Sequence, residues 1–365
     1  MPHELYKAIG LMSGTSIDGI DAALVETDGH AYVRPLGFMS VPYDPAFREQ
    51  VRRFFGHAHA ADDLEVKALE RALTERHADM VRVFQKQLNG TGHPINLIGF
   101  HGQTLHHDPA QRVTVQIGDG ALLAKLTGMS VVNDFRSADV KAGGQGAPLV
   151  PLYHRALAAQ LPKPIVILNI GGVSNITWIG GDSDDDILAF DVGPGNALID
   201  DWVLHHTGQP YDEHGLLAAS GSVAAGFVDN ALNKKFFKQK PPKSLDRNSF
   251  KGCMPHGMNA PDGAATLTMI TAQSIARSLK FLPRKPTHIY VAGGGRLNTT
   301  LMRWIGDLAN IAVNPVDDLN WSGDGLEAEA FAYLAVRSHL GLPLSVPGTT
   351  GVPQAMTGGR LHIPV

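Results

Sequence analysis

Cysteine is nearly absent from this chain of 365 residues, which contains Cys253 alone. A single cysteine excludes a disulfide within the chain and fits a reducing compartment. Long apolar runs are also missing, since no run approaches the roughly 18–20 residues that a membrane-spanning helix requires. The N-terminal stretch MPHELYK lacks the cationic and apolar regions of a secretory signal. We therefore expect a cytoplasmic protein without a membrane partner.

An excess of positive charge is missing too. The chain has 31 Lys and Arg residues against 35 Asp and Glu residues, which gives a formal net charge of −4. This balance lacks the basic footprint of a nucleic-acid-binding protein, so we expect no nucleic-acid partner.

Several common motifs are absent. The chain has no G-x-x-x-x-G-K-[ST] P-loop, no complete G-x-G-x-x-G fingerprint, no G-x-S-x-G elbow and no H-E-x-x-H zinc motif. His101, His106, His107 and Asp108 lie close in sequence, but their spacing matches no standard zinc site. No metal ligands are assigned.

The length predicts two domains, because 365 residues exceed the size of one ordinary core. A composition of 44% hydrophobic and 18% charged residues is typical of a soluble globular protein. The 40 glycines suggest many tight turns that approach a ligand.

A β-hairpin is predicted close to the N-terminus, where two apolar runs flank a small polar turn at residues 13–16. Gly14 and Gly19 allow a close approach of the backbone to a ligand and a positive φ. The N–H groups and hydroxyls of the turn suit phosphate oxygens. Asp18 and Asp21 would repel bare phosphate, so a metal ion or a bridging water is implied if phosphate binds. A hairpin with a polar tip and no ligand is the alternative.

The same design recurs about one domain later, where apolar runs flank the turn Gly171-Gly172. Strands alternate with helices elsewhere, which indicates an α/β fold. We expect a hinge at the glycine-rich residues 142–148 and an exposed loop at 234–252. Helices are predicted over 45–89, 120–126, 149–161, 264–282 and 325–341, and further strands over 31–38, 95–100, 113–119, 129–135, 188–192 and 288–292.

Asp191 ends an apolar strand and precedes a Gly-Pro-Gly turn that opens a helix. Its side chain should therefore project into a cleft near the helix N-terminus. A helix-capping or turn aspartate is the alternative reading of the same pattern. Asn196 could serve as the cap instead.

Three glycine-rich turns follow apolar strands, at residues 13–16, 171–175 and 293–295. This arrangement resembles the actin-like ATPase and sugar-kinase superfamily, in which two related domains each present a β-hairpin to ATP. Within it, the chain is similar to the anhydro-N-acetylmuramic acid kinase family. The resemblance rests on an ordered series of stretches over nearly the whole chain, at 9–19, 101–104, 115–118, 134–136, 143–151, 168–175, 190–196, 293–295 and 327–328.

The resemblance implies an α/β fold of two actin-like (ribonuclease H-like) domains with an ATP and substrate cleft between them. Residues 1–138 would form domain I, with the C-terminal residues 342–365 packing on it, and residues 139–341 would form domain II. The family is homodimeric, so a homodimer is expected.

The resemblance also implies site residues, carried over position by position. Asp191 would be the general base. The expected ATP-binding residues are Gly14, Thr15, Ser16, Ile17, Asp18, Gly19, Ile20, Asp21, Gly171, Gly172, Gly293, Gly294 and Gly295. The expected substrate-binding residues are His101, Gln103, Thr104, Arg136 and Glu327.

Two of these substrate-binding residues have ordinary structural alternatives. Arg136 could form a surface ion pair with Asp134 or Asp139, and Glu327 could be the solvated start of a helix. Relatives often carry two further arginines directly after the position of Arg136, where this chain has Ser137 and Ala138. Arg136 is therefore considered alone as the group that meets the sugar's carboxylate.

The implied reaction depends on ATP and Mg²⁺. It would open the 1,6-anhydro ring of 1,6-anhydro-N-acetylmuramic acid with water and phosphorylate O6, giving N-acetylmuramic acid 6-phosphate and ADP in cell-wall sugar recycling. O6 carries no proton, so the base would activate water. The alternatives are another sugar kinase of the superfamily and a non-catalytic, nucleotide-switched actin-like protein.

Overall fold

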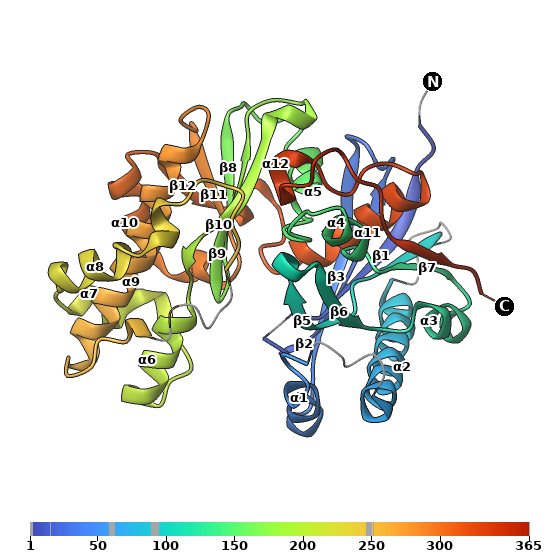
Figure 1. Cartoon of the computed structure of the whole chain (residues 1–365), viewed down its shortest axis with the longest axis horizontal. Helices are drawn as coiled ribbons and strands as arrows, with labels where there is room; N and C mark the ends of the chain where they lie inside the picture. Colours follow the sequence, from blue (N-terminus) through green and yellow to red (C-terminus); the bar gives the residue numbers. More distant parts are fainter. Residues whose placement is uncertain are drawn as a thin grey trace. The chain divides into compact units, whose positions relative to one another are not determined.

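The computed structural model describes residues 3–14, 16–57, 63–88, 95–245, 250 and 252–364. The chain divides into two compact units, whose elements are labelled in Figure 1. Unit 1 comprises Met1–Gln160 and Gly325–Val365, and unit 2 comprises Leu161–Asp324.

Unit 1 is built on a six-stranded sheet of order β13-β7-β4-β1-β2-β3. The first three strands form an antiparallel meander, β4 and β7 continue the sheet in parallel beyond β1, and β13 pairs antiparallel with β7. β5 and β6 form a separate two-stranded ribbon. The strands are β1 (Tyr6–Met12), β2 (Gly19–Thr27), β3 (Val33–Pro42), β4 (Leu97–Phe100), β5 (Gln103–Asp108), β6 (Val113–Ile117), β7 (Ser130–Asn133) and β13 (Arg360–His362).

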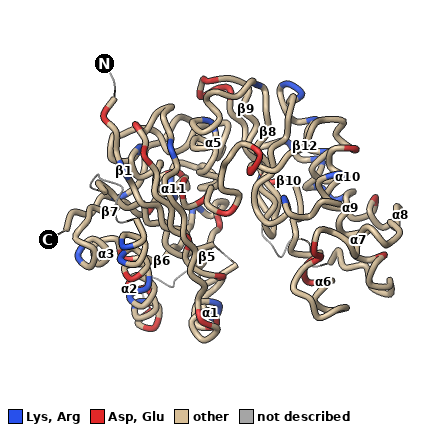
Figure 2. The backbone as a smooth tube through the Cα atoms, turned by 180° about the vertical axis from the view of Figure 1, so that it is seen from behind, with Lys and Arg blue, Asp and Glu red and all other residues tan. Residues whose placement is uncertain are grey.

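The helices of unit 1 begin where the sequence supplies caps. Asp44, Asp63 and Asp119 each accept a backbone N–H in the first turn of α1, α2 and α3, as N-cap aspartates do. Ion pairs such as Arg71–Glu75 line the outer side of α2, which carries both charge colours in Figure 2. The helices are α1 (Pro45–Arg52), α2 (Leu64–Gln87), α3 (Gly120–Thr127), α4 (Ser137–Lys141), α5 (Pro151–Leu157), α11 (Leu326–His339) and α12 (Pro347–Thr350).

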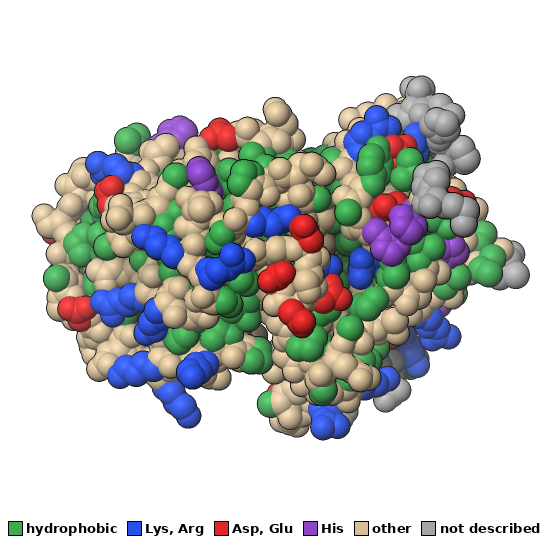
Figure 3. Space-filling model, turned by 90° about the horizontal axis from the view of Figure 1, so that it is seen from above, with side chains coloured by type: hydrophobic (Ala, Val, Ile, Leu, Met, Phe, Trp, Pro, Cys, Tyr) green, Lys and Arg blue, Asp and Glu red, His purple; other side chains and the backbone are tan. Residues whose placement is uncertain are grey.

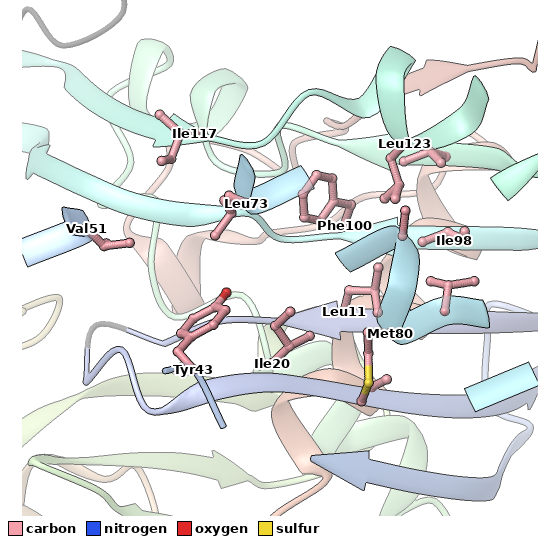
Figure 4. Packing of buried hydrophobic residues seen from close by; sticks show 14 of the residues in the cluster. Leu11, Ile20, Tyr43, Val51, Leu73, Met80, Ile98, Phe100, Ile117 and Leu123 are labelled. Atoms are coloured by element: carbon pink, nitrogen blue, oxygen red, sulfur yellow. The ribbon is translucent and has the colours of Figure 1, made fainter. Parts of the chain in front are cut away.

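The core of unit 1 lies between the sheet and α2. Leu11 of β1, Phe100 of β4 and Leu73 of α2 are completely buried in one cluster, and Figure 4 shows these side chains pointing toward one another. Side chains alternate between the two faces of a strand. Gly10, the neighbour of Leu11, therefore faces the opposite side of the sheet, where α11 packs.

The backbone of α11 lies directly on the sheet because two glycines leave room for it. Gly10 and Gly99 are partners in the parallel pair β1 and β4. A Cβ at Gly10 would lie 1.8 Å from the backbone oxygen of Ala328, and one at Gly99 would lie 2.0 Å from that of Phe331. Both contacts are impossible, so each position requires glycine.

Unit 2 repeats this topology with a five-stranded sheet of order β10-β9-β8-β11-β12. β8, β9 and β10 form an antiparallel meander, and β11 and β12 follow in parallel beyond β8. The predicted α/β class and the duplicated hairpin are thus confirmed. The strands are β8 (Ile165–Ile170), β9 (Val173–Ile179), β10 (Ile187–Pro194), β11 (His288–Ala292) and β12 (Ala312–Pro315).

The helices of unit 2 gather around α9, which is buried along most of its length and is capped by Asn259. One cluster packs α9 against α6 and α8, and a second packs α9 and α10 against the sheet. The helices are α6 (Ala197–Thr207), α7 (Leu216–Ser220), α8 (Ala225–Leu232), α9 (Ala260–Ser278) and α10 (Thr299–Ala309).

Both boundaries between the units differ from the expected ones at 138/139 and 341/342. The segment 139–160 belongs to unit 1, because α5 packs on α11. Residues 325–341 belong to unit 1 because α11 covers β1, β2 and β4. The C-terminal segment joins the same unit through β13.

The expected hinge at residues 142–148 is wrong, because this segment is held firmly inside unit 1. The carboxylate of Asp139 accepts hydrogen bonds from the N–H of Gly146 at 2.7 Å, from the Thr350 hydroxyl at 2.6 Å and from the Ser345 hydroxyl. The N–H of Gln145 donates to the carbonyl oxygen of Thr350 at 2.7 Å. These bonds fix the glycine-rich segment to the C-terminal part of the chain.

The expected exposed loop at 234–252 is also partly wrong. Phe237, Lys243 and Phe250 are buried within it. Residues 246–249 and 251 lie outside the described residues. The helical prediction over 45–89 is divided by the structure into α1 and α2, and residues 58–62 and 89 again lie outside the described part.

Among the described residues, no single helix is long and apolar enough to cross a membrane, although the segments Glu213–Ser220 and Ala225–Leu232, bent by 118°, pass that test as a pair. On the face shown in Figure 3, Lys and Arg side chains are interspersed with Asp and Glu side chains, in keeping with the small net charge of −4.

The contact between α11 and the sheet predicts the effect of Gly99→Ala. The added methyl group overlaps the backbone of α11, so we expect a loss of about 1–3 kcal/mol or more in the free energy of unfolding. Urea denaturation measures the loss. Gly226→Ala is the control, because a Cβ at this exposed glycine of α8 meets nothing within 4 Å. Equal stability of Gly99→Ala and the control would contradict the packing described.

Candidate active site

The turn between β1 and β2 is held by a chain of buried hydrogen bonds. The Ser13 hydroxyl donates to Oε1 of Gln103 at 2.8 Å and accepts from the Tyr43 hydroxyl at 3.1 Å. Nε2 of Gln103 donates to the carbonyl oxygen of Gly14 at 3.2 Å. Because these groups are satisfied internally, they fix the shape of the turn.

Two glycines of the hairpin have different reasons to be glycine. A Cβ at Gly14 would meet only Oγ of Ser16, at 3.7 Å, so open space lies beside this backbone. A Cβ at Gly19 would lie 2.2 Å from the Val41 oxygen, so Gly19 is required by its pairing with β3. Neither adopts the expected positive φ, which occurs instead at Ile17 with φ 58°.

The remaining hairpin residues divide into buried and exposed ones. Ile17 and Ile20 are core residues, so they can offer only backbone groups to a ligand. Asp18 is exposed and forms an ion pair with Arg48 at 3.0 Å. Asp21 pairs with Met12 where β1 ends. Thr15 lies outside the described residues.

His101 directly follows β4 and meets Arg136. Nδ1 of His101 lies 2.8 Å from the carbonyl oxygen of Gly102, while Nη2 of Arg136 lies 2.9 Å from Nε2. A guanidinium can only donate, so Nε2 accepts and the proton sits on Nδ1. Burial and the nearby Arg136 hold the pKa of His101 well below its usual value, and the ring is neutral.

The guanidinium of Arg136 is anchored on two sides. Nη1 donates to the carbonyl oxygen of Gly146 at 2.6 Å, and the group lies 6.0 Å from the centre of the Phe331 ring. Burial lowers the pKa of Arg136 to about 10, while Glu327 and Asp139 act to raise it. Arg136 therefore stays charged at neutral pH, and the alternative of a surface ion pair does not describe it.

Glu327 lies in the first turn of α11, close enough to Arg136 to interact with it electrostatically. Its side chain is exposed, yet desolvation by surrounding protein raises the pKa of its carboxyl group. Arg136 lowers that pKa and Asp21 raises it further. Asp21, Arg136 and Glu327 thus form one electrostatic group in unit 1.

Two expected sugar contacts have other partners in the structure. Gln103 is completely buried under the β1–β2 turn, so it supports the turn and offers no group to a sugar. Thr104 accepts a hydrogen bond from Nε2 of Gln116 at 3.1 Å, and the same Nε2 lies 3.1 Å from Nε2 of His101. Gln116 was not predicted as a site residue, although it lies in the stretch 115–118 that carries part of the family resemblance.

In unit 2, the turn between β8 and β9 packs against the start of α6. The carbonyl oxygen of Gly171 accepts the N–H of Asn196 at 2.8 Å, and that of Gly172 accepts the N–H of Gly195 at 3.0 Å. A Cβ at Gly171 or Gly172 would meet no atom closer than 3.7 Å. Both glycines therefore border open space, as Gly14 does in unit 1.

The third glycine-rich turn follows β11 and reaches the same end of β8. Gly293 has φ 72°, and a Cβ there would lie 2.5 Å from Oδ1 of Asn169. A Cβ at Gly295 would lie 2.4 Å from the Ile170 side chain, whereas one at Gly294 would have its nearest neighbour at 3.5 Å. Gly294 is therefore the member of the turn with space beside it.

Asp191 lies on β10 next to a β-bulge, opposite Asn175 of β9. Its Oδ2 accepts the N–H of Leu245 at 2.6 Å, and its own N–H donates to the carbonyl oxygen of Lys243 at 3.1 Å. Burial raises the pKa of Asp191 to about 7, against the lowering effects of the Leu245 N–H and of Lys243. The carboxyl group caps no helix and is tuned to gain or lose a proton near neutral pH.

Lys243 was missed, because a lysine in a polar stretch usually lies in solvent. It is buried, and its Nζ lies 4.3 Å from the centre of the Phe236 ring. The phenylalanines on either side of it, Phe236, Phe237 and Phe250, could have indicated a buried environment. Among the described residues, no group of three or more His, Cys, Asp and Glu side chains could hold a metal ion.

The structure thus connects His101, Thr104, Arg136 and Glu327 in unit 1, and it gathers the glycine turns at one end of β8 in unit 2. A model of the family "Anhydro-N-acetylmuramic acid kinase" matches residues 6–363. The relative of that name from Rhizorhabdus wittichii is 50% identical over 361 residues, which cover 98% of this chain and 99% of the relative.

A second relative of the same name, from Zymomonas mobilis, is 50% identical over 362 residues, covering 97% of this chain and 99% of the relative. Among solved structures, ligand-bound xylulose kinase from Lactobacillus acidophilus matches with a TM-score of 0.50 and 11% identity, over 99% of this chain and 94% of that one. This likeness shows the fold, that of the actin-like sugar kinases. The chain belongs to the anhydro-N-acetylmuramic acid kinase family.

Proposed function

We propose that this protein uses ATP and water to convert 1,6-anhydro-N-acetylmuramic acid into N-acetylmuramic acid 6-phosphate and ADP, in cell-wall (peptidoglycan) sugar recycling. Membership of the kinase family over residues 6–363 supports the reaction. The single structural observation that carries it is the half-buried carboxylate of Asp191, held by the Leu245 N–H, whose pKa of about 7 suits a base at neutral pH.

The chemistry follows from the bridge in the substrate, whose O6 is bonded to C1 and has no proton to lose. Water attacks C1, the C1–O6 bond breaks, and O6 attacks the γ-phosphorus as the bond to ADP breaks. The proton of the water passes to Asp191. Because the Leu245 N–H occupies Oδ2, we assign proton transfer to Oδ1.

We assign the ATP phosphates to the backbone of Gly14, Gly171 and Gly172, since each of these glycines has open space where a side chain would stand, and to the backbone of the neighbouring Ser16. Gly294 is assigned to the nucleoside for the same reason. Bound Mg²⁺ would neutralise charge on the phosphates. The carboxylates of Asp18 and Asp21 are the hard oxygen donors on the hairpin that suit this ion, directly or through water.

We assign the sugar to His101, Thr104, Arg136 and Glu327. The charged and anchored guanidinium of Arg136 suits the lactyl carboxylate of the substrate. The family resemblance further supports a homodimer in the cytoplasm. Gln103 is reassigned from the sugar to support of the phosphate turn, because it is buried against Ser13 and Gly14.

The phosphate assignment predicts that Gly14→Val weakens ATP binding. The new side chain occupies the open space beside the turn, and losing one charge-assisted hydrogen bond should raise the KM for ATP roughly tenfold or more. Steady-state kinetics measure the change. Gly226→Val, which adds the same group at an exposed glycine of α8, is the control. An unchanged KM in folded Gly14→Val would remove the turn from the ATP site.

The proposed base predicts that Asp191→Asn keeps ATP binding but loses turnover. General base catalysis contributes about 10²–10⁴-fold, so kcat should fall by at least that much. Product formation is followed by mass spectrometry, and ATP affinity by calorimetry. Asp307→Asn, at an exposed position of α10, is the control and should retain full activity. Full turnover of Asp191→Asn would refute the assignment.

A further inference from the structure

A short segment of the chain crosses β10 at Asp191. Lys243 and Leu245 hold Asp191 at two points: the Lys243 carbonyl oxygen accepts the Asp191 N–H at 3.1 Å, and the Leu245 N–H donates to Oδ2 at 2.6 Å. We name residues 243–245 the strap. Its backbone thus fixes both the main chain and one carboxylate oxygen of Asp191.

The side chain of Lys243 anchors the strap. Nζ donates to the carbonyl oxygen of Phe236 at 3.2 Å, and lies 4.3 Å from the Phe236 ring centre. It also lies 4.8 Å from the ring centre of Phe281 and 5.6 Å from that of Phe190. Three aromatic rings within about 6 Å of an ammonium group give favourable cation–π contacts, which are stronger when desolvated.

The position of Phe190 links this anchor to Asp191. Phe190 and Asp191 are neighbours on β10, so their side chains leave opposite faces of the sheet. The side chain of Lys243 therefore packs on the face of the sheet that carries Phe190. The backbone of the strap binds Asp191 along the outer edge of β10, which is the edge strand. The side chain and the backbone of Lys243 thus connect the aromatic rings to the Asp191 carboxylate.

We propose that Lys243 is a positioning residue, which locks the strap against β10 and so holds the Asp191 carboxylate ready to act as a base. This proposal rests on the proposed function, in which Asp191 activates water. Lys243 itself does not touch the reacting atoms.

The charges around the strap give the direction of the expected effect. Lys243 and the Leu245 N–H both lower the pKa of Asp191, against the larger effect of burial. Burial and the nearby Lys280 lower the pKa of Lys243 to about 8, against the raising effect of Asp191. A base works only when unprotonated, so activity is lost as the pH falls through the pKa of Asp191. Loss of the Lys243 cation or of the strap contact raises that pKa and moves the loss of activity to higher pH.

The test is the pH dependence of kcat/KM for the sugar in the full-length protein. Wild type should lose activity below about pH 7, the pKa of Asp191. Lys243→Met keeps the length of the side chain and removes its charge. We expect the acid limb, the loss of activity at low pH, to move to higher pH, because Lys243 and the strap lower the pKa of Asp191. The KM for ATP should not change, and Lys243→Arg should keep the limb near that of wild type.

Lys234→Met is the matched control. Lys234 also places its Nζ over a ring, 5.6 Å from the centre of Phe250, and donates to Sγ of Cys253 at 3.0 Å. Lys234 does not contact Asp191, so the acid limb of Lys234→Met should coincide with that of wild type. A merely structural role of Lys243 would lower thermal stability without moving the limb. If Lys243→Met does not fold, Lys243→Gln replaces it.

If the acid limb of Lys243→Met coincides with that of wild type, the positioning role is overturned. The proposed function still stands in that case, provided that wild type is active and Asp191→Asn is inactive. Full activity of Asp191→Asn would instead overturn both. A limb that moves in Lys243→Met and equally in the control would also overturn the proposal, because the shift would then be general to lysines of this segment.

Discussion

The contact of α11 with the sheet of unit 1 determines the position of most of the candidate sugar site. Gly10 and Gly99 allow the helix backbone to rest on β1 and β4. This places Phe331 of α11 against His101, with ring centres 4.5 Å apart, and brings Glu327 into the field of Arg136. A bulkier sheet surface would lift the helix, and these groups would separate.

The same strand order in both units explains why functional groups recur at equivalent places. β1 and β2 correspond to β8 and β9, and the turns that join them carry the glycines with open space. β4 corresponds to β11, so His101 and Gly293 each follow the strand beside the hairpin. Backbone groups at strand ends suit phosphate oxygens. In the proposed function, unit 2 adds Asp191 on β10, the last strand of its meander.

Local patterns predicted much of the fold, because apolar runs and glycine turns report on strands and hairpins within a short window. They failed where the outcome depends on distant partners. Helical spacing in 325–341 predicts a helix but not the sheet that it covers. The sequence around Gln103 does not reveal that its amide turns inward to Ser13, and burial of Lys243 depends on Phe190 and Phe281, which lie far away in the chain. β12 was missed because one exposed and three half-exposed residues give little signal.

A single turnover in H₂¹⁸O shows whether water attacks C1 while O6 accepts the phosphoryl group. Mass spectrometry of the products locates the label. We expect ¹⁸O at C1 of the sugar and none in the transferred phosphoryl group. An ordinary sugar kinase would place label in neither position, and an ATPase would place it in free phosphate. Either of those results would contradict the proposed reaction.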